Sequence, residues 1–368
     1  MDDRPAGNRA QRADLLNHVA LGLPYAKGDF SLTDWTATAD LKGATVRETA
    51  FRGTRFDGAD LGGATFVNCD FTGAVFRAAM LDGTRFVSCA MGGAAFEEAR
   101  ISGGAFIGCA LAGARFSGTL VSDGSFLNCD LTGSVWRAAQ VDGAALMDCD
   151  VEDIDLSDAR TARLFAARAD LRSAKLDGFS CEMGVFPEVD LSQRDLRTLS
   201  LARCNLMGAN LSGANLSGMD LSGSFLMQCT APGADFSGAI AHSAHFSKSD
   251  LTGARFGGAQ LGSANFQESR LAGADFSGAD LDMAVMTGAQ APGARFVGAN
   301  LSYTQLAHAR LDGVDASKAR FLRTDLHLAA TDGLLQLGAS GSQLPTDPEK
   351  AVAESYVPQY VRATAMEG

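Results

Sequence analysis

Several residue types that carry chemistry are scarce in this chain of 368 residues, which holds five histidines, two tryptophans and four tyrosines. No apolar run approaches the roughly 20 residues that span a bilayer. The N-terminal apolar stretch Leu15–Leu23 is interrupted by Asn17 and His18. The sequence therefore predicts neither a membrane span nor a secretory signal, and we expect a cytoplasmic protein.

Basic residues are also in deficit, with 31 Lys and Arg against 43 Asp and Glu, a net charge of −12. This balance argues against direct binding to nucleic acid or to an anionic membrane. The histidines are scattered, and no serine recurs beside a histidine and an acid as a catalytic triad would require. We therefore predict no enzyme, no cofactor and no metal site.

What the chain has instead is a strict period. A hydrophobic residue recurs at every fifth position from Leu41 to Leu326, and small residues such as Ala166 replace some members without shifting the frame. A period of five fits neither a helix nor a flat strand, but it fits a chain that turns a corner every five residues. Fixed-period self-similarity of this kind predicts a solenoid.

A second period of twenty residues gives the size of one coil, which is four sides of five residues. It is marked by Cys69, Cys89, Cys109, Cys129 and Cys149. We expect these thiols to stack inside the core as small apolar groups, neither disulfide-bonded nor metal-binding. Phenylalanine recurs ten residues apart and should line two opposite walls. Glycines such as Gly63, two residues after a centre, should occupy the corners.

These units resemble the pentapeptide-repeat family, whose pattern A(D/N)LXX stands here as ANLSG at 209–213 and ADFSG at 234–238. The resemblance implies an all-β fold, a right-handed quadrilateral parallel β-helix, with coils that hydrogen-bond along the axis. The resemblance covers residues 39–328, and the β-helix that it implies spans 39–330, about 14 coils at roughly 4.8 Å each. It predicts fold rather than function, because function resides in sites added to a fold.

The two ends depart from the repeat, as a solenoid with open ends requires. We expect residues 1–38 to form an N-terminal cap with a short helix that begins after Asn8. Residues 331–368 should form a loop at 338–343 and a short helix opened by a capping box at Thr346. This tail could fold back over the last coil, or Tyr356 and Tyr360 could bind a partner or a second subunit.

Charge is distributed unevenly near the middle of the chain, where an acidic run at 142–158 precedes a basic run at 160–175. The repeat is also weakest there, since Arg194 stands at an inward position, where we expect the wall to open. Solvated faces are the plain interpretation, and a partner-binding surface is the alternative. The candidate residues are Asp142, Asp148, Asp150, Asp153, Asp155, Arg163, Arg168 and Arg172, with the three acids at 150, 153 and 155 expected to point outward.

Three functions stay open, all of them with a protein as the partner. The first is a non-enzymatic scaffold or adaptor that binds another protein along a rigid side face. The second comes from the family resemblance, which implies an acidic DNA mimic that binds DNA gyrase. Duplex DNA nevertheless carries about one charge per 1.7 Å, far more than this chain. The third, also by resemblance, is an adaptor for a contractile secretion system in bacteria.

Overall fold

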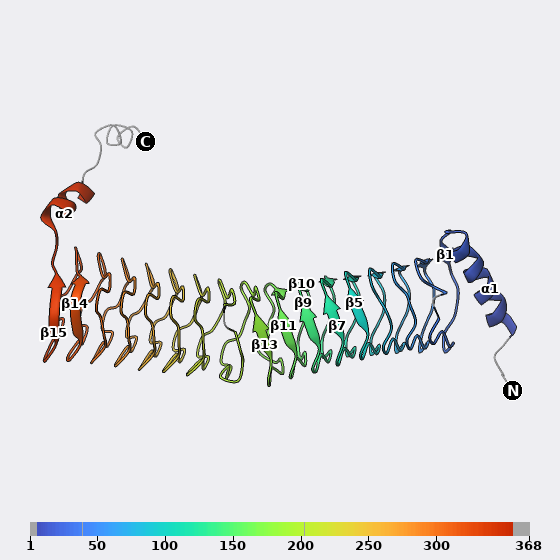
Figure 1. The fold of residues 1–368 in the computed structure, drawn as a ribbon, viewed down its shortest axis with the longest axis horizontal. Coiled ribbons are helices and arrows are strands. Elements are labelled where there is room, and N and C mark those ends of the chain that lie inside the picture. The colour runs from blue at the N-terminus through green and yellow to red at the C-terminus, as the bar shows by residue number, and fades with distance from the viewer. Residues whose placement is uncertain (1–5, 39, 202, 356–368) are drawn as a thin grey trace. The chain divides into compact units, whose positions relative to one another are not determined.

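The computed structural model describes residues 6–38, 40–201 and 203–355. The chain forms two compact units, of which unit 1 comprises Met1–Asn215 with Met219–Cys229 and unit 2 comprises Leu216–Gly218 with Thr230–Gly368. Each unit is a stack of parallel coils (Figure 1). The sequence predicted this parallel β-solenoid with short terminal helices.

Unit 1 begins with helix α1, Ala6–Ala20, and contains two parallel sheets. The eight-stranded sheet runs in the order β1 (Tyr25–Ala26), β2 (Thr45–Arg47), β3 (Thr65–Val67), β4 (Arg85–Val87), β6 (Ala105–Ile107), β8 (Ser125–Leu127), β10 (Ala145–Met147) and β12 (Phe165–Ala166). The five-stranded sheet runs in the order β13 (Ser180–Glu182), β11 (Arg160–Ala162), β9 (Gln140–Asp142), β7 (Leu120–Ser122) and β5 (Arg100–Ser102).

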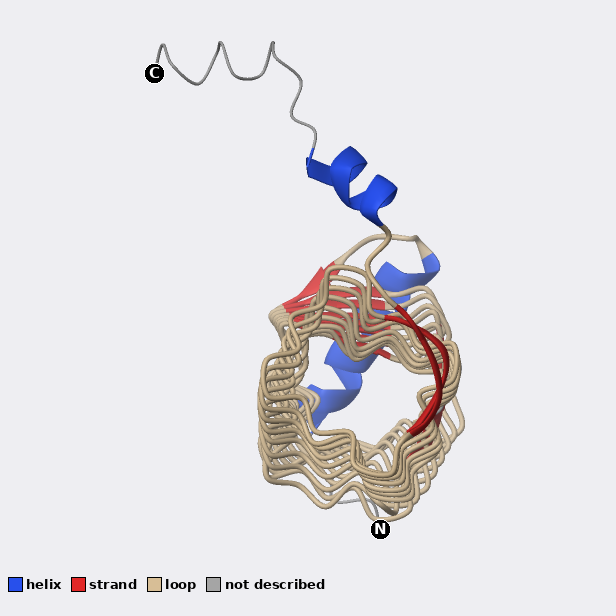
Figure 2. Cartoon of the chain, turned by 90° about the vertical axis from the view of Figure 1, so that its left-hand side faces the viewer, coloured by secondary structure: helices blue, strands red, loops and turns tan. Residues whose placement is uncertain are grey.

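Unit 2 is a stack of coils joined mainly by isolated parallel bridges, such as Asp235 to Arg255 and Arg255 to Asp275. It ends in the strand pair β14 (Arg320–Asp325) and β15 (Ser340–Leu344), followed by helix α2 (Pro348–Ser355). In the end view each coil is a ring of short sides joined by corners, and this strand pair is nearest the viewer (Figure 2).

The register between coils is twenty residues. Phe66 pairs with Phe86, and Phe86 pairs with Phe106. At the N-terminal end the offset is twenty-one, because Tyr25 pairs with Val46. From Thr45 to the start of β14 the offset is twenty residues, so residues twenty apart lie side by side, about 4.8 Å from one another. The five-residue period follows because each coil has four sides of five residues.

The paired coils extend beyond the predicted range of 39–330. Phe30 and Trp35 are buried, and each donates its backbone N–H to a carbonyl of the next coil, at 2.8 Å in both cases. At the other end the predicted loop at 338–343 is wrong, because β15 pairs with β14 there. The sequence placed Phe30 and Trp35 in the N-terminal cap because the coil that contains them is one residue longer, which breaks the twenty-residue frame.

The helix boundaries also differ in detail from the sequence prediction. Helix α1 begins at Ala6, so Asn8 lies inside it rather than at its cap. Its Leu15 is fully buried, as expected for a lid on the first coil. Helix α2 is capped by Asp347, whose Oδ1 accepts the N–H groups of Glu349 and Lys350 at 2.9 and 3.2 Å. Thr346 accepts the N–H of Leu328 instead.

The core is a column of stacked side chains, as the period predicted. Phe76 and Phe96 stack with ring centroids 4.8 Å apart, and on the opposite wall Phe106 and Phe126 do the same. Rings from the two walls meet edge to face, for example Phe96 with Phe106 at 5.8 Å. Both arrangements are favoured by the ring quadrupole, so stacking adds to the free energy of burial.

The corners use left-handed backbone, which explains the glycine two residues after each centre. Gly63 has a φ of 70°, and an L-residue seldom adopts that region. Asn68 takes the same corner position with a φ of 53°. Asn and Asp tolerate this conformation better than most residues, so the corner position accepts them as well.

The predicted cysteine column is present. Cys69, Cys89, Cys109 and Cys129 are free thiols with 1 or 2% exposure, whereas Cys149 at the end of the column is half-buried. Each buried Sγ faces a backbone carbonyl, for example Cys109 with Phe86 O at 3.4 Å. These thiols therefore pack as small groups of the core.

We expect Leu271→Ala to lower the free energy of unfolding by about 2–5 kcal/mol, because Leu271 is a fully buried centre residue. Thermal or urea unfolding followed by circular dichroism measures this loss. Ser277→Ala, at a partly exposed position of the same unit, is the control. A melting curve unchanged by Leu271→Ala would contradict an inward-facing centre.

Thiol labelling should rank the cysteines by burial. In the native protein Cys149 should react first with a maleimide, and Cys69, Cys89 and Cys109 should react only after denaturation. Contact with the Cys129 thiol, together with burial, raises the pKa of Cys149, so even its reaction should be slower than that of an exposed thiol. Mass spectrometry of a labelling time course reports the order. Simultaneous rapid labelling would mean that the column faces solvent.

Candidate interaction surface

The acidic and basic runs near the middle of the chain lie in successive coils of unit 1 and pair with each other. Arg163 donates two hydrogen bonds to Asp142, from Nε at 2.9 Å and Nη2 at 2.6 Å. Arg168 likewise pairs with Asp148. Residues about twenty apart are neighbours in space, so two arginines of the basic run neutralise two carboxylates of the acidic run.

Asp155 stands in the same outward column as the exposed Arg115 and Lys175, but its own side chain is buried. It is 4% exposed; its Oδ2 accepts Arg137 Nε at 2.7 Å and its Oδ1 accepts the N–H of Ser157 at 3.1 Å. Burial alone would raise the pKa of Asp155. The hydrogen bonds from Ser157 and Arg137 outweigh burial and bring the pKa below its ordinary value.

The two other acids expected to point outward, Asp150 and Asp153, are exposed. Within the described ranges, neither carboxylate is in an ion pair with a basic side chain. Arg172 forms a two-bond pair with Asp170, the shortest contact being 2.6 Å. Of the predicted site residues, Tyr356 and Tyr360 lie outside the described residues.

The wall loses a bridge beside Arg194, as the predicted local opening requires: among the described residues Asp155 pairs with Lys175, but Lys175 does not pair with Asp195. Asp170 still pairs with Asp190. The Arg194 guanidinium is half-buried and donates to the carbonyls of Arg172 and Ala174, at 2.8 and 2.7 Å. Hydrogen bonds to backbone oxygens thus satisfy a charge that would be costly in an apolar wall.

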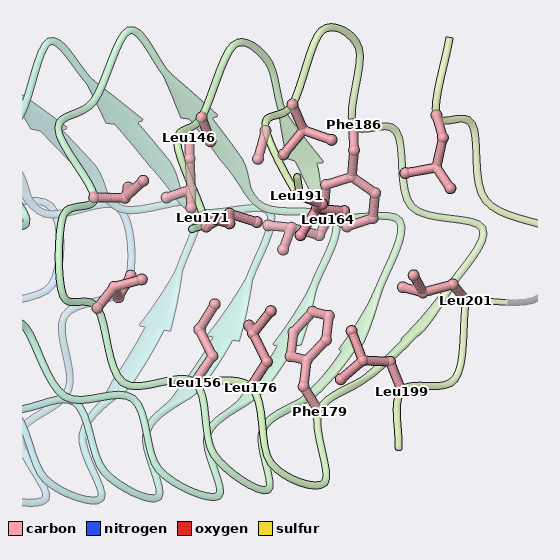
Figure 3. A pocket seen from close by; sticks show the side chains of 16 residues that line it. Leu146, Leu156, Leu164, Leu171, Leu176, Phe179, Phe186, Leu191, Leu199 and Leu201 are labelled. Atoms are coloured by element: carbon pink, nitrogen blue, oxygen red, sulfur yellow. The ribbon is translucent and has the colours of Figure 1, made fainter. Parts of the chain in front are cut away.

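Beneath these coils lies a cavity of about 40 Å³ (Figure 3). Its sixteen lining side chains are all apolar, and the small centre residue Ala166 is one of them. Ligand pockets are usually 300–1,000 Å³ with a few polar groups. This cavity is therefore a packing defect where large centre residues are missing, and it offers no polar group for catalysis.

In unit 2 the structure brings together two histidines that seemed scattered in the sequence. The Nε2 atoms of His308 and His327 lie 3.0 and 3.3 Å from the same Glu354 carboxylate oxygen. The spacing of nineteen residues could have indicated this, since it places the histidines in successive coils. Glu354 belongs to α2, so the cluster ties that helix to the coils.

The same cluster is a poor metal site. The backbone N–H of Asp347 points at His327 Nδ1 from 3.1 Å, so Nδ1 must be the unprotonated nitrogen. In the neutral ring Nε2 then carries the proton and donates a hydrogen bond to Glu354. A histidine that binds a metal through Nε2 normally donates a hydrogen bond from Nδ1, the reverse of this arrangement.

One surface feature was not predicted: a row of outward apolar side chains on the eight-stranded sheet of unit 1. Each is the last residue of its three-residue strand, and successive members pair in register. We call this row the apolar ladder; it consists of Val67, Val87, Ile107, Leu127 and Met147. Met147 is 42% exposed, and the other four are half-buried.

The apolar ladder lies on a nearly uncharged face. The first residues of the same strands are Thr65, Arg85, Ala105, Ser125 and Ala145. Further along, Phe165, Val185, Met207 and Phe225 continue the apolar character. By contrast, a neighbouring side carries Asp130, Asp150, Asp170 and Asp190 at equivalent positions. The sequence shows this apolar ladder only when outward positions are compared at intervals of twenty residues.

The fold itself does not require apolar residues in the ladder. The same coil position in unit 2 is occupied by Ser247, Gln267 and Thr287. Leu127 and Met147 are not β-branched, so strand propensity does not explain them. Apolar side chains in contact with one another on a protein surface usually indicate a binding site, whereas scattered ones do not.

Among the described residues, no helix is both long enough and apolar enough to cross a membrane. No curated protein matches the chain in sequence. Models of pentapeptide repeats match residues 30–75 in one form and residues 185–223, 226–258, 259–296 and 294–329 in another. Together these segments cover just over half of the chain.

Several solved structures are similar. The plasmid-mediated fluoroquinolone resistance protein QnrB1 is 19% identical, over 54% of this chain and 92% of its own, with a TM-score of 0.38. HetL, from the cyanobacterium Nostoc and involved in regulating heterocyst differentiation, is 19% identical over 89% and 93%, with a TM-score of 0.21. A thylakoid-lumen protein from Arabidopsis thaliana is 27% identical over 37% and 74%, with a TM-score of 0.18. At these scores the likeness carries no information about binding partners.

Asp155→Asn should lower the free energy of unfolding by about 1–2 kcal/mol at neutral pH, through the lost charge-assisted bond to Arg137. Because the pKa of Asp155 is lower in the folded than in the unfolded protein, its ionised form stabilises the fold above the unfolded pKa. That stabilisation disappears as the pH falls through the folded pKa, so the variant and wild type should converge in acid.

The control is Asp150→Asn, which changes an exposed acid at the equivalent position of the preceding side and should leave stability unchanged within about 0.5 kcal/mol. Urea unfolding of both variants between pH 2 and pH 7 provides the comparison. An equal loss for both variants at pH 7, or a loss at Asp155 that persists in acid, would contradict a buried and paired Asp155.

Proposed function

Because the chain belongs to the pentapeptide-repeat family, we propose that it is a non-enzymatic scaffold. It binds a protein partner through the outer face of the eight-stranded sheet in unit 1. The observation that carries this proposal is the apolar ladder. It is contiguous, outward-facing and absent from the equivalent positions of unit 2.

The surroundings of the ladder suit a protein interface. Specific interfaces have an apolar centre with few charges and a polar rim that excludes water. Here the rim includes the Asp148–Arg168 ion pair and exposed Glu188, all at the corner beside the ladder. In this proposal Asp148 and Arg168, two residues of the predicted charged surface, form the edge of the interface rather than its centre.

A DNA mimic that binds gyrase is the second candidate, and the net charge of −12 favours it. The ion pairs weigh against it, because they place a guanidinium beside many of the carboxylates. Examples are Asp142 with Arg163 and Asp235 with Arg255. A contractile secretion component is the third candidate partner. The identity of a captured protein separates these cases.

The test is affinity capture from the native cell with the full chain as bait. A ladder variant, Ile107→Glu with Leu127→Glu, should retain at least about 30-fold less of its partner, as expected for loss of a hot spot of about 2 kcal/mol. The matched control, Gln267→Glu with Thr287→Glu, places the same charges at the same coil position in unit 2 and should capture normally. The partner is then purified and its affinity measured directly.

Both variants should keep the wild-type melting temperature within a few degrees, because the substituted side chains point outward. Equal capture by the ladder variant and the control would contradict the assignment of the binding face. The exposed acids Asp150 and Asp153 would then become the candidate binding residues.

A further inference from the structure

The following inference rests on the proposed function, because it names the occupant of the same face. We propose that the apolar ladder is covered by a second copy of this chain. The two eight-stranded sheets face each other across a two-fold axis that runs parallel to the stacking direction of the coils in unit 1. In this arrangement coils at the same level meet, with their strands running in opposite directions.

The shape of the face is complementary to itself. Along the ladder the side chains are large, whereas three of the five strands begin with a small residue, Ala105, Ser125 or Ala145; the other two begin with Thr65 and Arg85. Each of these small residues is half-buried beside its large neighbour, so a ridge runs alongside a trough. The proposed two-fold axis exchanges the two sides of each strand. It therefore lays the ridge of one copy into the trough of the other.

From Ala105 to Ala167 the complementarity holds coil by coil, which favours this register; at Phe225 and Met227 both side chains are large. The coil after Met147 reverses the order of sizes, with Phe165 in the trough column and Ala167 in the ladder column. A copy related by the proposed axis makes the same reversal at the same level, so Phe165 of each copy meets Ala167 of the other. An arrangement with the coils running in opposite directions would instead bring Met147 against Met147 and lose this match.

The repeat distance points to the same occupant. Side chains in the ladder recur at the coil spacing of about 4.8 Å, whereas one helical turn rises about 5.4 Å. A helix laid along the ladder would drift out of step by more than half a repeat within five coils. A second solenoid has the same spacing and stays in step along the entire ladder.

Charge favours contact through this face over contact through the others. Two copies of a chain with a net charge of −12 repel one another through most faces. The face with the ladder carries few charges, and the proposed axis places Arg85 opposite Val87 rather than opposite another Arg85. The aliphatic part of Arg85 can then cover Val87 while its guanidinium reaches water at the edge.

The size of the face is adequate. From Val67 to Met227 the outward residues span eight coil spacings, about 38 Å, and a three-residue strand is about 10 Å wide. The flat area is therefore roughly 400 Å² per copy, and side-chain relief increases the accessible area beyond that. Two copies together bury about 800 Å² of flat area before side-chain relief is added, close to the roughly 1,000 Å² expected of a specific interface.

Oligomeric state provides the first test. The purified full chain at about 10 µM should be a dimer by light scattering coupled to gel filtration and by sedimentation. Ile107→Glu with Leu127→Glu should raise the dimer dissociation constant at least about 30-fold, with an unchanged circular dichroism spectrum and melting temperature. The control variant, Gln267→Glu with Thr287→Glu, should remain as dimeric as the wild type.

Cross-linking provides the second test, because it reads the register. Copies that carry Ala145→Cys are mixed with copies that carry Met147→Cys and treated with a short bismaleimide. The mixture should yield a cross-linked dimer, since residue 145 of one copy faces residue 147 of the other. Each variant alone should yield little beyond the wild-type background from native Cys149.

A monomeric wild type would overturn the inference. So would a dimer that the ladder variant leaves intact, or a dimer that cross-links through Met147→Cys alone. If the wild type is monomeric and the ladder variant still loses a different protein in the capture experiment, the second copy is refuted while the proposed function stands. If the ladder affects neither dimer nor capture, both proposals fail.

Discussion

The in-register hydrogen bonding between coils is the constraint on which this structure depends. From Ala44 onward a backbone group of one coil bonds its counterpart about twenty residues away, as in Phe96 N–H to Arg115 O at 2.7 Å. Over these coils the hydrogen bonding places each residue beside those twenty positions before and after it. Columns of like side chains therefore form automatically: phenylalanines and thiols stack inside, and carboxylates, guanidinium groups or apolar groups line up outside.

The sequence predicted the core well, because the inward positions follow a strict five-residue period that can be read directly from the sequence. The phenylalanine walls, the cysteine column and the corner glycines all lie where the five- and twenty-residue periods placed them. The acidic and basic runs were interpreted as surface patches because their residues are adjacent in the sequence. Asp142 and Asp148 instead pair with Arg163 and Arg168 of the next coil.

Some features could not be read from the pattern for identifiable reasons. The burial of Asp155 depends on Arg137, which lies eighteen residues earlier and reaches forward to the next coil. The pairing of His308 and His327 with Glu354 depends on where α2 docks, which no repeat specifies. The apolar ladder was in principle visible. It emerges when outward positions are read at intervals of twenty, and it is hidden when they are read in sequence order.

The central claim is that outward residues twenty apart are neighbours on one exposed face. Two cysteines introduced at Val87 and Ile107 should be joined within one chain by a bimane reagent that links thiols about one coil spacing, or ~4.8 Å, apart. Cysteines at Val87 and Leu127, two spacings apart, should not be joined. Efficient fluorescence for the first pair alone, in dilute native protein, is the predicted result. Equal yields for the two pairs, or no reaction of either until the protein is denatured, would contradict the account.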